Sequence, residues 1–413
     1  ARIIHAVEEA QGSRAPTQRF VDQFAKVYTP VVFLFALAIA IVPPLFMAEL
    51  WYDWIYRALV LLVVACPCAL VISTPVTIVS GLAAAARKGI LIKGGVYLET
   101  GGKLGFLALD KTGTITHGKP VQTDYMPLVE QDSELYRTHA ASLASRSDHP
   151  VSQAIAKHAT ENGLTFATVE GFEALPGRGV RGTIEGMDFH LGNHRLVEEL
   201  GLCSPELETT LERLERQGKT VVVLCNPQRA IALFAVADTV KDSSRQAIEE
   251  LHALGVKTTM LTGDNPHTAD AIAQQVGIDE ARGNLLPVDK LQAIEALQAR
   301  GYVVGMVGDG INDAPALAKS EIGFAMAAAG TDTAIETADV ALMDDDLRKI
   351  PAFIRLSQQT AVILKQNIVL ALGIKALFLA ITLTGQATMW MAVFADMGVS
   401  LLVVFNGLRL LKK

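Results

Sequence analysis

Four long apolar stretches stand out in the pattern of hydrophobic and polar positions along the chain. Two lie near its beginning, at about 28–47 and 54–80, and two near its end, at about 362–383 and 387–408. A helix rises about 1.5 Å per residue, so roughly 20 residues cross the hydrocarbon core of a bilayer. The pattern therefore predicts four membrane-spanning helices, with a turn at residues 384–386 between the last two.

Basic residues flank only one end of each stretch. The loop between the first two stretches carries the acidic Glu49 and Asp53 instead, and the loop between the last two carries no charge. Loops rich in Lys and Arg stay on the cytoplasmic side of a membrane. Both ends of the chain and the large central block are therefore expected in the cytoplasm.

Short apolar runs alternate with helical patterns through the central block. Three of these runs end at the acidic residues Asp110, Asp264 and Asp309. Such alternation is typical of a doubly wound parallel sheet, which binds ligands at the carboxyl ends of its strands. A segment with strands and helices of its own predicts an inserted α+β domain. The expected division is a cytoplasmic lead-in and membrane helices at 1–88, the sheet domain at 89–120 and 237–356, its insertion at 121–236, and membrane helices at 357–413.

Composition agrees with a membrane protein. Half of the 413 residues are hydrophobic and 19% are charged, against about 25% charged in a typical soluble domain. The net charge of -7, from 43 acidic and 36 basic residues, gives no support to a nucleic-acid partner. The four cysteines are too few for a disulfide scaffold.

The strand ends carry three motifs suited to phosphoryl transfer: DKTGT at 110–114, TGD at 262–264 and GDGINDAP at 308–315. An aspartate at a strand end can attack a phosphoryl group and form an aspartyl phosphate. This chemistry needs a hard cation, and Mg²⁺ prefers oxygen ligands such as the carboxylates of Asp309 and Asp313. Lys290 can balance the charge of the transferred group.

With these motifs the chain resembles the P-type ATPases, membrane pumps that cycle through an aspartyl phosphate on a haloacid dehalogenase-like domain. The resemblance implies that Asp110 is phosphorylated, that Asp309 and the Thr112 main chain hold Mg²⁺, and that Thr262 and Lys290 contact the phosphoryl group. The expected catalytic residues are Asp110, Lys111, Thr112, Thr262, Gly263, Asp264, Lys290 and Asn312. The expected Mg²⁺ ligands are Asp110, Thr112, Asp309 and Asp313.

Thr112 favours a pump over a phosphatase. Related phosphatases carry an Asp two positions after the nucleophile as general acid and base, a task that threonine cannot perform. The aspartyl phosphate is therefore expected to survive long enough to drive a conformational change.

The predicted insertion carries SDHP at 147–150 and GRGV at 177–180. In heavy-metal P-type ATPases a His-Pro pair and a Gly-x-Gly of this kind line the ATP pocket. The resemblance implies nucleotide-binding roles for His149, Gly177, Gly179 and Asn193, whereas Ala144 stands where that family usually has a Glu. The glycines also match a dinucleotide-binding pattern, but a strand-like sequence follows them where that pattern requires a helix.

Cys66–Pro67–Cys68 lies inside the second apolar stretch. Proline loosens a helix and frees a backbone carbonyl, so both thiols can turn towards one point. Lys375 and Asp396 are the single charges of the last two stretches, and charges at membrane depth are usually functional. Counted from the outer helix ends, Cys66, Lys375 and Asp396 lie roughly 18, 12 and 14 Å deep. We therefore expect one shared site.

Thiolates select soft ions such as Zn²⁺, Cd²⁺, Pb²⁺ or Cu⁺. Two thiolates and one carboxylate carry -3, which a divalent ion and a protonated Lys375 neutralise. CPC resembles the heavy-metal subgroup of the P-type ATPases, and Lys375 and Asp396 resemble its zinc/cadmium/lead branch. The implied ligands of the transported ion are Cys66, Cys68, Lys375 and Asp396. We further hypothesise that the Lys375 ammonium moves to Asp396 and the thiolates when the ion leaves.

The sequence contains no Thr-Gly-Glu of the kind that marks the actuator domain of such pumps. We expect the C-terminal part of a longer pump in the plasma (inner) membrane. This part is expected to bind ATP, Mg²⁺ and the transported metal, and to need the N-terminal part for a complete cycle. Two alternatives stay open: a copper-transporting ATPase, and a membrane-bound metal sensor that is phosphorylated without pumping.

Overall fold

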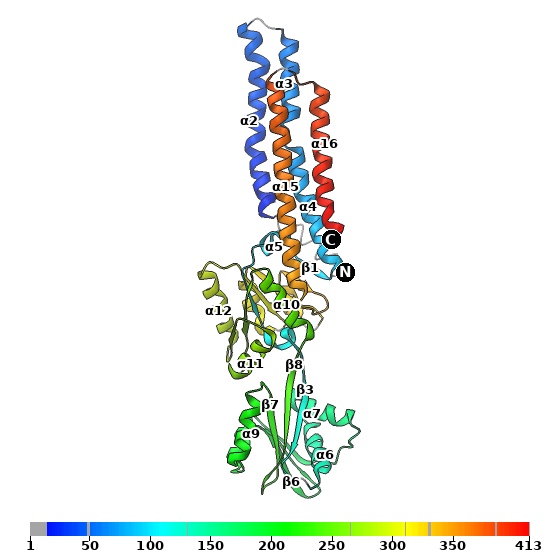
Figure 1. The fold of residues 1–413 in the computed structure, drawn as a ribbon, viewed down its shortest axis with the longest axis vertical. Coiled ribbons are helices and arrows are strands. Elements are labelled where there is room, and N and C mark those ends of the chain that lie inside the picture. Colours follow the sequence, from blue (N-terminus) through cyan, green and yellow to red (C-terminus); the bar gives the residue numbers. More distant parts are fainter. Residues whose placement is uncertain are drawn as a thin grey trace.

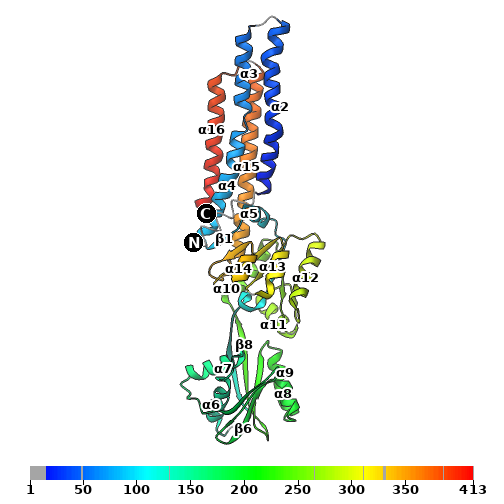
Figure 2. The same ribbon diagram turned by 180° about the vertical axis from the view of Figure 1, so that it is seen from behind.

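The computed structural model describes residues 15–47, 50–129, 131–264, 266–309, 311–328, 332–384 and 386–412. The molecule is elongated, with a bundle of long helices at one end, a parallel sheet in the middle and an antiparallel sheet at the other end (Figure 1). The view from behind shows the same order, with α5 (Gly95–Gly101) between the bundle and the parallel sheet (Figure 2). The predicted fold class is confirmed.

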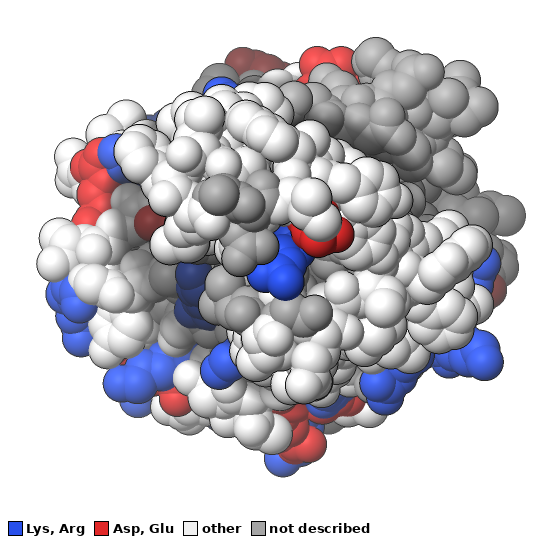
Figure 3. Space-filling model, turned by 90° about the horizontal axis from the view of Figure 1, so that it is seen from above, with Lys and Arg blue, Asp and Glu red and all other residues white. Residues whose placement is uncertain are grey.

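The bundle contains five helices: α2 (Pro16–Met47), α3 (Trp51–Ala65), α4 (Cys68–Arg87), α15 (Lys349–Leu383) and α16 (Met389–Leu408). Within the described residues they make four spans that are long and apolar enough to cross a membrane, because α3 and α4 together form one. The second apolar stretch is thus two helices, broken at Cys66–Pro67. Proline has no N–H and cannot extend the helix hydrogen bonding. The outer end of the bundle shows a mostly uncharged surface (Figure 3).

The parallel sheet contains seven strands in the order β1-β13-β12-β11-β2-β9-β10. Their bounds are Ile90–Ile92 (β1), Phe106–Leu109 (β2), Lys257–Leu261 (β9), Glu280–Arg282 (β10), Val304–Gly308 (β11), Ile322–Met326 (β12) and Val340–Leu342 (β13). Only β1 runs antiparallel to its neighbour. Leu109 on β2 pairs with Met260 on β9 and Val307 on β11. This register brings the carboxyl ends of the three motif-bearing strands to one edge.

Helices cover both faces of the parallel sheet. They are α5 (Gly95–Gly101), α10 (Asp242–Ala253), α11 (Pro266–Val276), α12 (Pro287–Ala299), α13 (Ala314–Lys319) and α14 (Asp332–Thr337). Two separate apolar clusters result, one including α10, α11 and α15 residues and the other α12 and α13 residues. Both faces of each central strand are buried in these clusters, which explains why the strands read as continuous apolar runs.

The antiparallel sheet contains six strands in the order β3-β8-β7-β6-β5-β4. Their bounds are Thr116–Pro127 (β3), Glu170–Leu175 (β4), Gly179–Ile184 (β5), Met187–Gly192 (β6), Thr220–Cys225 (β7) and Ala230–Val240 (β8). Helices α6 (Ser133–Ala144) and α7 (Pro150–Glu161) contribute to one core, and α8 (His194–Glu199) and α9 (Pro205–Glu215) to the other.

Strands β3 and β8 connect the two sheets. Their pairing begins at Thr116 and Val240, so it extends beyond the expected insertion at 121–236, whose boundaries stay a prediction. The chain thus leaves the parallel sheet directly after the DKTGT segment and returns on the neighbouring strand. Any rotation of the antiparallel sheet must therefore act on this segment.

Candidate functional site

The first candidate site lies at the carboxyl edge of the parallel sheet. Asp110 directly follows β2, is 7% exposed, and donates its backbone N–H to Val307 O at 2.9 Å. The next residues form a tight turn in which Gly113 has φ 69°. A Cβ added to Gly113 would lie only 1.8 Å from Asp309 Oδ2. Glycine is therefore required for this turn to pass beside Asp309.

Three carboxylates meet at this edge. Oxygen atoms of Asp110, Asp309 and Asp313 all lie within 4.8 Å of one another. Lys290 Nζ, on α12, donates to Asp110 Oδ1 at 2.5 Å and to Asp313 Oδ1 at 2.8 Å. Three ionised carboxylates against one ammonium leave an excess of two negative charges. Hard oxygen donors with this excess fit a Mg²⁺ ion.

The carboxyl groups resist ionisation without a metal ion. Burial and the neighbouring Asp313 raise the pKa of Asp110 to about 7, although Lys290 acts in the opposite direction. Burial and Asp313 likewise raise the pKa of Asp309 to about 6. Burial disfavours the charged Lys290, yet Asp110 and Asp313 together raise its pKa. A divalent cation would stabilise the ionised carboxylates and so offset both their burial and their mutual repulsion.

The TGD motif lies beside the same edge. Thr262 is 3% exposed, and its hydroxyl accepts a hydrogen bond from Asp264 N at 3.2 Å. The Asp264 carboxylate forms an ion pair with Lys111. Gly263 lies between them in the loop after β9, whereas the side chains of Thr112 and Asn312 are exposed. The structure thus groups most of the expected catalytic residues and leaves these two facing outward.

Two residues that contact this region are not among the predicted site residues. Lys241 Nζ donates to Gly113 O at 2.6 Å and to Asp345 O at 3.3 Å. Asp238 accepts hydrogen bonds from Gly118 N and Lys119 N, both at 3.2 Å, and from the Thr116 hydroxyl. Both residues thus fix the backbone of the DKTGT turn and of the residues that follow it. Asp238 lies on β8, and Lys241 directly follows this strand. Both lie more than 100 residues after the DKTGT segment in the sequence. No local motif marks either residue, so sequence reasoning did not identify them.

The second candidate site is a pocket of about 360 Å³ on the antiparallel sheet. All four expected nucleotide residues line it: His149, Gly177, Gly179 and Asn193. The Asn193 amide donates to Gly177 O at 3.0 Å and accepts from Leu196 N at 3.2 Å.

Two further residues, Gly179 and Ala144, bear on the predicted nucleotide site. A Cβ at Gly179 would lie 2.2 Å from Leu191 O, so the close approach of β5 to β6 requires glycine there. Ala144 is fully buried in the core below the sheet. A glutamate at that position would bring a carboxylate into this core, which costs free energy unless the carboxylate is paired.

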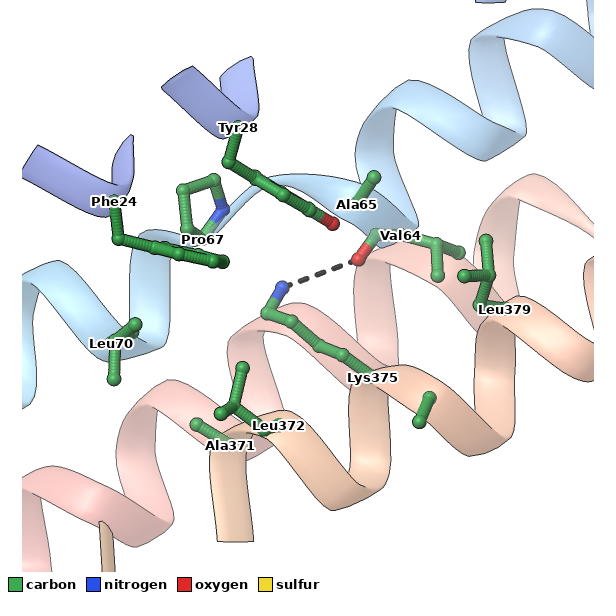
Figure 4. A pocket seen from close by; sticks show the side chains of 11 residues that line it. Phe24, Tyr28, Val64, Ala65, Pro67, Leu70, Ala371, Leu372, Lys375 and Leu379 are labelled. Carbon is green, nitrogen blue, oxygen red and sulfur yellow. Dashed lines mark hydrogen bonds between the residues drawn. The ribbon is translucent and has the colours of Figure 1, made fainter. Parts of the chain in front are cut away.

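The third candidate site lies at the break between α3 and α4. Lys375 Nζ donates to Val64 O at 3.3 Å, to Cys66 O, and to Asp396 Oδ1 at 2.9 Å. Figure 4 shows the Lys375 side chain extending towards Val64 in a pocket that also holds Phe24, Tyr28 and Pro67. The ammonium thus donates to two carbonyl groups near the break and pairs with one carboxylate. A charge among apolar helices requires such partners.

The two sulfurs of this site are joined. Cys66 and Cys68 form a disulfide, with their Cα atoms 5.5 Å apart. The break at Pro67 therefore brings both side chains to one point, as the sequence predicts. A disulfide offers no thiolate, so binding of a soft metal ion requires the reduced pair.

Comparisons with known proteins agree with this geometry. Residues 106–320 match the haloacid dehalogenase-like hydrolase family. The whole chain is 48% identical to 57% of a cadmium-transporting ATPase of Staphylococcus aureus. It is 44% identical to 55% of a zinc/cadmium/lead-transporting P-type ATPase of Escherichia coli. The chain thus spans less than two thirds of the length of these relatives.

A solved structure is similar over almost the whole chain. It is a zinc-transporting PIB-type ATPase in the E2.Pi state, with a TM-score of 0.86 and 43% identity. The similarity covers 99% of this chain and 67% of that protein.

Proposed function

Because the chain belongs to the haloacid dehalogenase-like hydrolases and, within them, to the PIB-type ATPases, we propose that it uses ATP to export soft divalent metal ions through an aspartyl-phosphate intermediate. The observation that carries the proposal is the pairing of Lys375 with Asp396 beside the Cys66–Pro67–Cys68 break. It places a charged, cysteine-containing cluster among apolar helices, in a chain that also holds a phosphoryl-transfer site.

The chemical step falls to Asp110. In its ionised form one carboxylate oxygen attacks the γ-phosphorus of ATP, the bond to the bridging oxygen breaks, and ADP leaves with that electron pair. Lys290 holds the Asp110 carboxylate in place and offsets the charge of the arriving phosphoryl group. Thr262 offers a hydroxyl at the same edge.

Mg²⁺ would be held by Asp110, Asp309, Asp313 and the main chain of Thr112. It would supply charge neutralisation for the phosphoryl oxygens. Thr112 contributes no acid or base, so the aspartyl phosphate persists instead of being hydrolysed at once.

The nucleotide would lie in the pocket of the antiparallel sheet. His149, Gly177, Gly179 and Asn193 line its walls, and the glycines leave backbone exposed for close approach of a ligand. A rotation of the antiparallel sheet about the connecting strands β3 and β8 would then bring the bound nucleotide close to Asp110.

The transported ion would be bound by the reduced Cys66 and Cys68 together with Asp396. A Zn²⁺, Cd²⁺ or Pb²⁺ ion and a protonated Lys375 neutralise two thiolates and one carboxylate, whereas Cu⁺ would leave a buried negative charge. The apolar helices place this site in a lipid bilayer, and we propose the plasma membrane with both sheets in the cytoplasm.

The test is phosphorylation of the protein by radiolabelled ATP in the presence of Cd²⁺ and a reductant. We expect an acid-stable, hydroxylamine-sensitive phosphate that Asp110→Asn abolishes without changing Cd²⁺ binding. Zn²⁺ and Cu⁺ in parallel reactions separate the zinc/cadmium branch from a copper pump. Absence of a hydroxylamine-sensitive phosphate from the chain and from the longer protein would exclude the proposal.

A further inference from the structure

A further pocket lies at the end of the bundle that faces the parallel sheet. It has a volume of about 250 Å³ and lies where α15 passes the last residues of the chain. Its polar lining consists of two guanidinium groups and three amides: Arg355, Arg409, Gln358, Gln359 and Gln366. None of these residues belongs to the three sites described above.

Among the described residues, only one of the two guanidinium groups has a carboxylate partner. Arg355 forms an ion pair with Glu250 of α10 at 2.7 Å. Arg409 bonds to the neutral Asn406 Oδ1 at 2.9 Å and has no carboxylate partner within the part of the chain that the structure describes. The pocket therefore presents a net positive charge and several N–H donors, which suits an anion with several oxygen atoms.

Contacts beneath the pocket keep this lining in place. The Asn406 amide donates to Gln366 Oε1 at 3.3 Å and to Asn367 Oδ1 at 2.9 Å. Asn367 is fully buried and donates to Thr77 Oγ1 at 3.2 Å and to Val403 O at 3.1 Å. The pocket rim is thus connected to a hydrogen-bonded node that joins α4, α15 and α16, the helices that carry Cys68, Lys375 and Asp396.

The position of the pocket decides which anion fits. Arg409 directly follows the apolar part of α16, and Arg355 precedes the apolar part of α15. The apolar side chains of Val362 and Ile363 complete the lining, and Val362 is 55% exposed. A ligand here meets cations on one side and an apolar surface at the membrane boundary on the other.

We propose that this pocket binds the phosphate group of an anionic phospholipid from the cytoplasmic leaflet. Basic pockets between membrane helices on this side suit such headgroups. The phosphate bonds to Arg409 and the glutamine amides, while the acyl chains lie along Val362. The bound lipid holds α15 and α16 together next to the node at Asn367. The proposal requires a membrane-embedded bundle but no ATP chemistry, so its test is independent of phosphorylation.

The test uses the full chain in a neutral detergent, with bound lipid counted by native mass spectrometry during titration with phosphatidylglycerol or phosphatidylcholine. We expect saturable binding of one phosphatidylglycerol and no saturable binding of phosphatidylcholine. Arg409→Gln should weaken phosphatidylglycerol binding about tenfold, because it removes a charge-assisted phosphate contact. Lys365→Gln is the matched control, since it removes an exposed cation of α15 that does not line the pocket; we expect less than a twofold change.

Three outcomes would overturn the proposal. Equal loss of binding in Arg409→Gln and Lys365→Gln would show general attraction to a basic surface. Equal binding of phosphatidylcholine would show that no anion is selected. Inorganic phosphate that competes at the same concentrations as phosphatidylglycerol would identify the ligand as a soluble anion.

Discussion

The phosphorylation site and the transport site both contain a lysine bonded to an aspartate, yet their charges differ. At the first, Lys290 bonds to Asp110 and Asp313 while Asp309 lies beside them. At the second, Lys375 bonds to Asp396 and to backbone carbonyls. With its three carboxylates ionised the first site has an excess of two negative charges, whereas at the second site one ammonium balances one carboxylate.

Under the proposed function, this difference would give the two metal ions different roles. At the proposed phosphorylation site the lysine and Mg²⁺ would act together, because one ammonium cannot neutralise three ionised carboxylates. At the proposed transport site the lysine would compete with the arriving ion for Asp396, because the two residues are already paired, and would neutralise the remaining negative charge once the ion is bound. Under the proposed function, the first site would therefore keep its cation during the reaction, and the second would exchange its cation in every cycle.

The largest effect is expected from Lys290→Ala. Removing the ammonium leaves Asp110 and Asp313 adjacent and unpaired, and it removes a donor from the transferred group. Loss of one preorganised donor of this kind costs about 10²–10³ in rate. We expect phosphoenzyme formation from ATP to fall by about this factor, as measured by rapid quench at saturating ATP and Mg²⁺.

Lys319→Ala is the control for Lys290→Ala. Lys319 forms an exposed ion pair with Glu295 on the same domain, and exposed pairs contribute little. Its phosphorylation rate should remain within twofold of the parent protein. A Lys290→Ala protein that is phosphorylated at the parent rate would show that the buried ammonium has no part in the chemistry.

The apolar pattern and the strand-end motifs allowed the fold class and the grouping of Asp110, Asp309 and Asp313 to be predicted. These features are local, since each strand end is marked by its own residues and the parallel register brings them together. Asp238 and Lys241 could not be found in this way. They reach the DKTGT segment only because β8 returns beside β3 after more than 100 residues. Pro67 indicated a loosened helix, whereas the two separate helices on either side became visible only in three dimensions.

Lys375→Ala should have a smaller effect. It should strengthen metal binding, whereas Lys290→Ala should slow phosphorylation. Without the ammonium, Asp396 is unpaired and the empty site is one charge more negative, so we expect Cd²⁺ to bind about tenfold more tightly, which corresponds to about 1.4 kcal/mol, although the loaded site then keeps one negative charge. Release should slow accordingly and metal-stimulated turnover should fall. Cd²⁺ affinity of the reduced protein can be followed by the ultraviolet absorption of the cadmium–thiolate bonds.

Asp396→Asn provides the contrasting variant for the transport site. It removes a ligand as well as the partner of Lys375, so it should weaken Cd²⁺ binding. If Lys375→Ala instead retains normal affinity, full turnover and normal pH dependence, the lysine is not a built-in counterion, and the contrast between the two lysines disappears.

The smallest expected effect is the dependence of stability on pH at the phosphorylation site. The folded protein raises the pKa of Asp110 to about 7 and that of Asp309 to about 6, from the ordinary value of 3.8. Between pH 4 and 7 the folded state thus binds more protons than the unfolded state at these two groups. Their contribution therefore makes stability fall as pH rises through this range.

Adding Mg²⁺ distinguishes the contribution of Asp110 and Asp309 to the pH dependence of stability from the contributions of other titrating groups. Because the ion compensates the ionised carboxylates, it should reduce the loss of stability between pH 5 and 7.5. We expect the melting temperature of the parallel-sheet domain at pH 7.5 to rise by about 3 °C with Mg²⁺, or roughly 1 kcal/mol for a domain of this size. Asp309→Asn should produce a similar rise without Mg²⁺ and a weaker response to it. An equal response to Mg²⁺ in both proteins would show that the ion does not act through this carboxylate cluster.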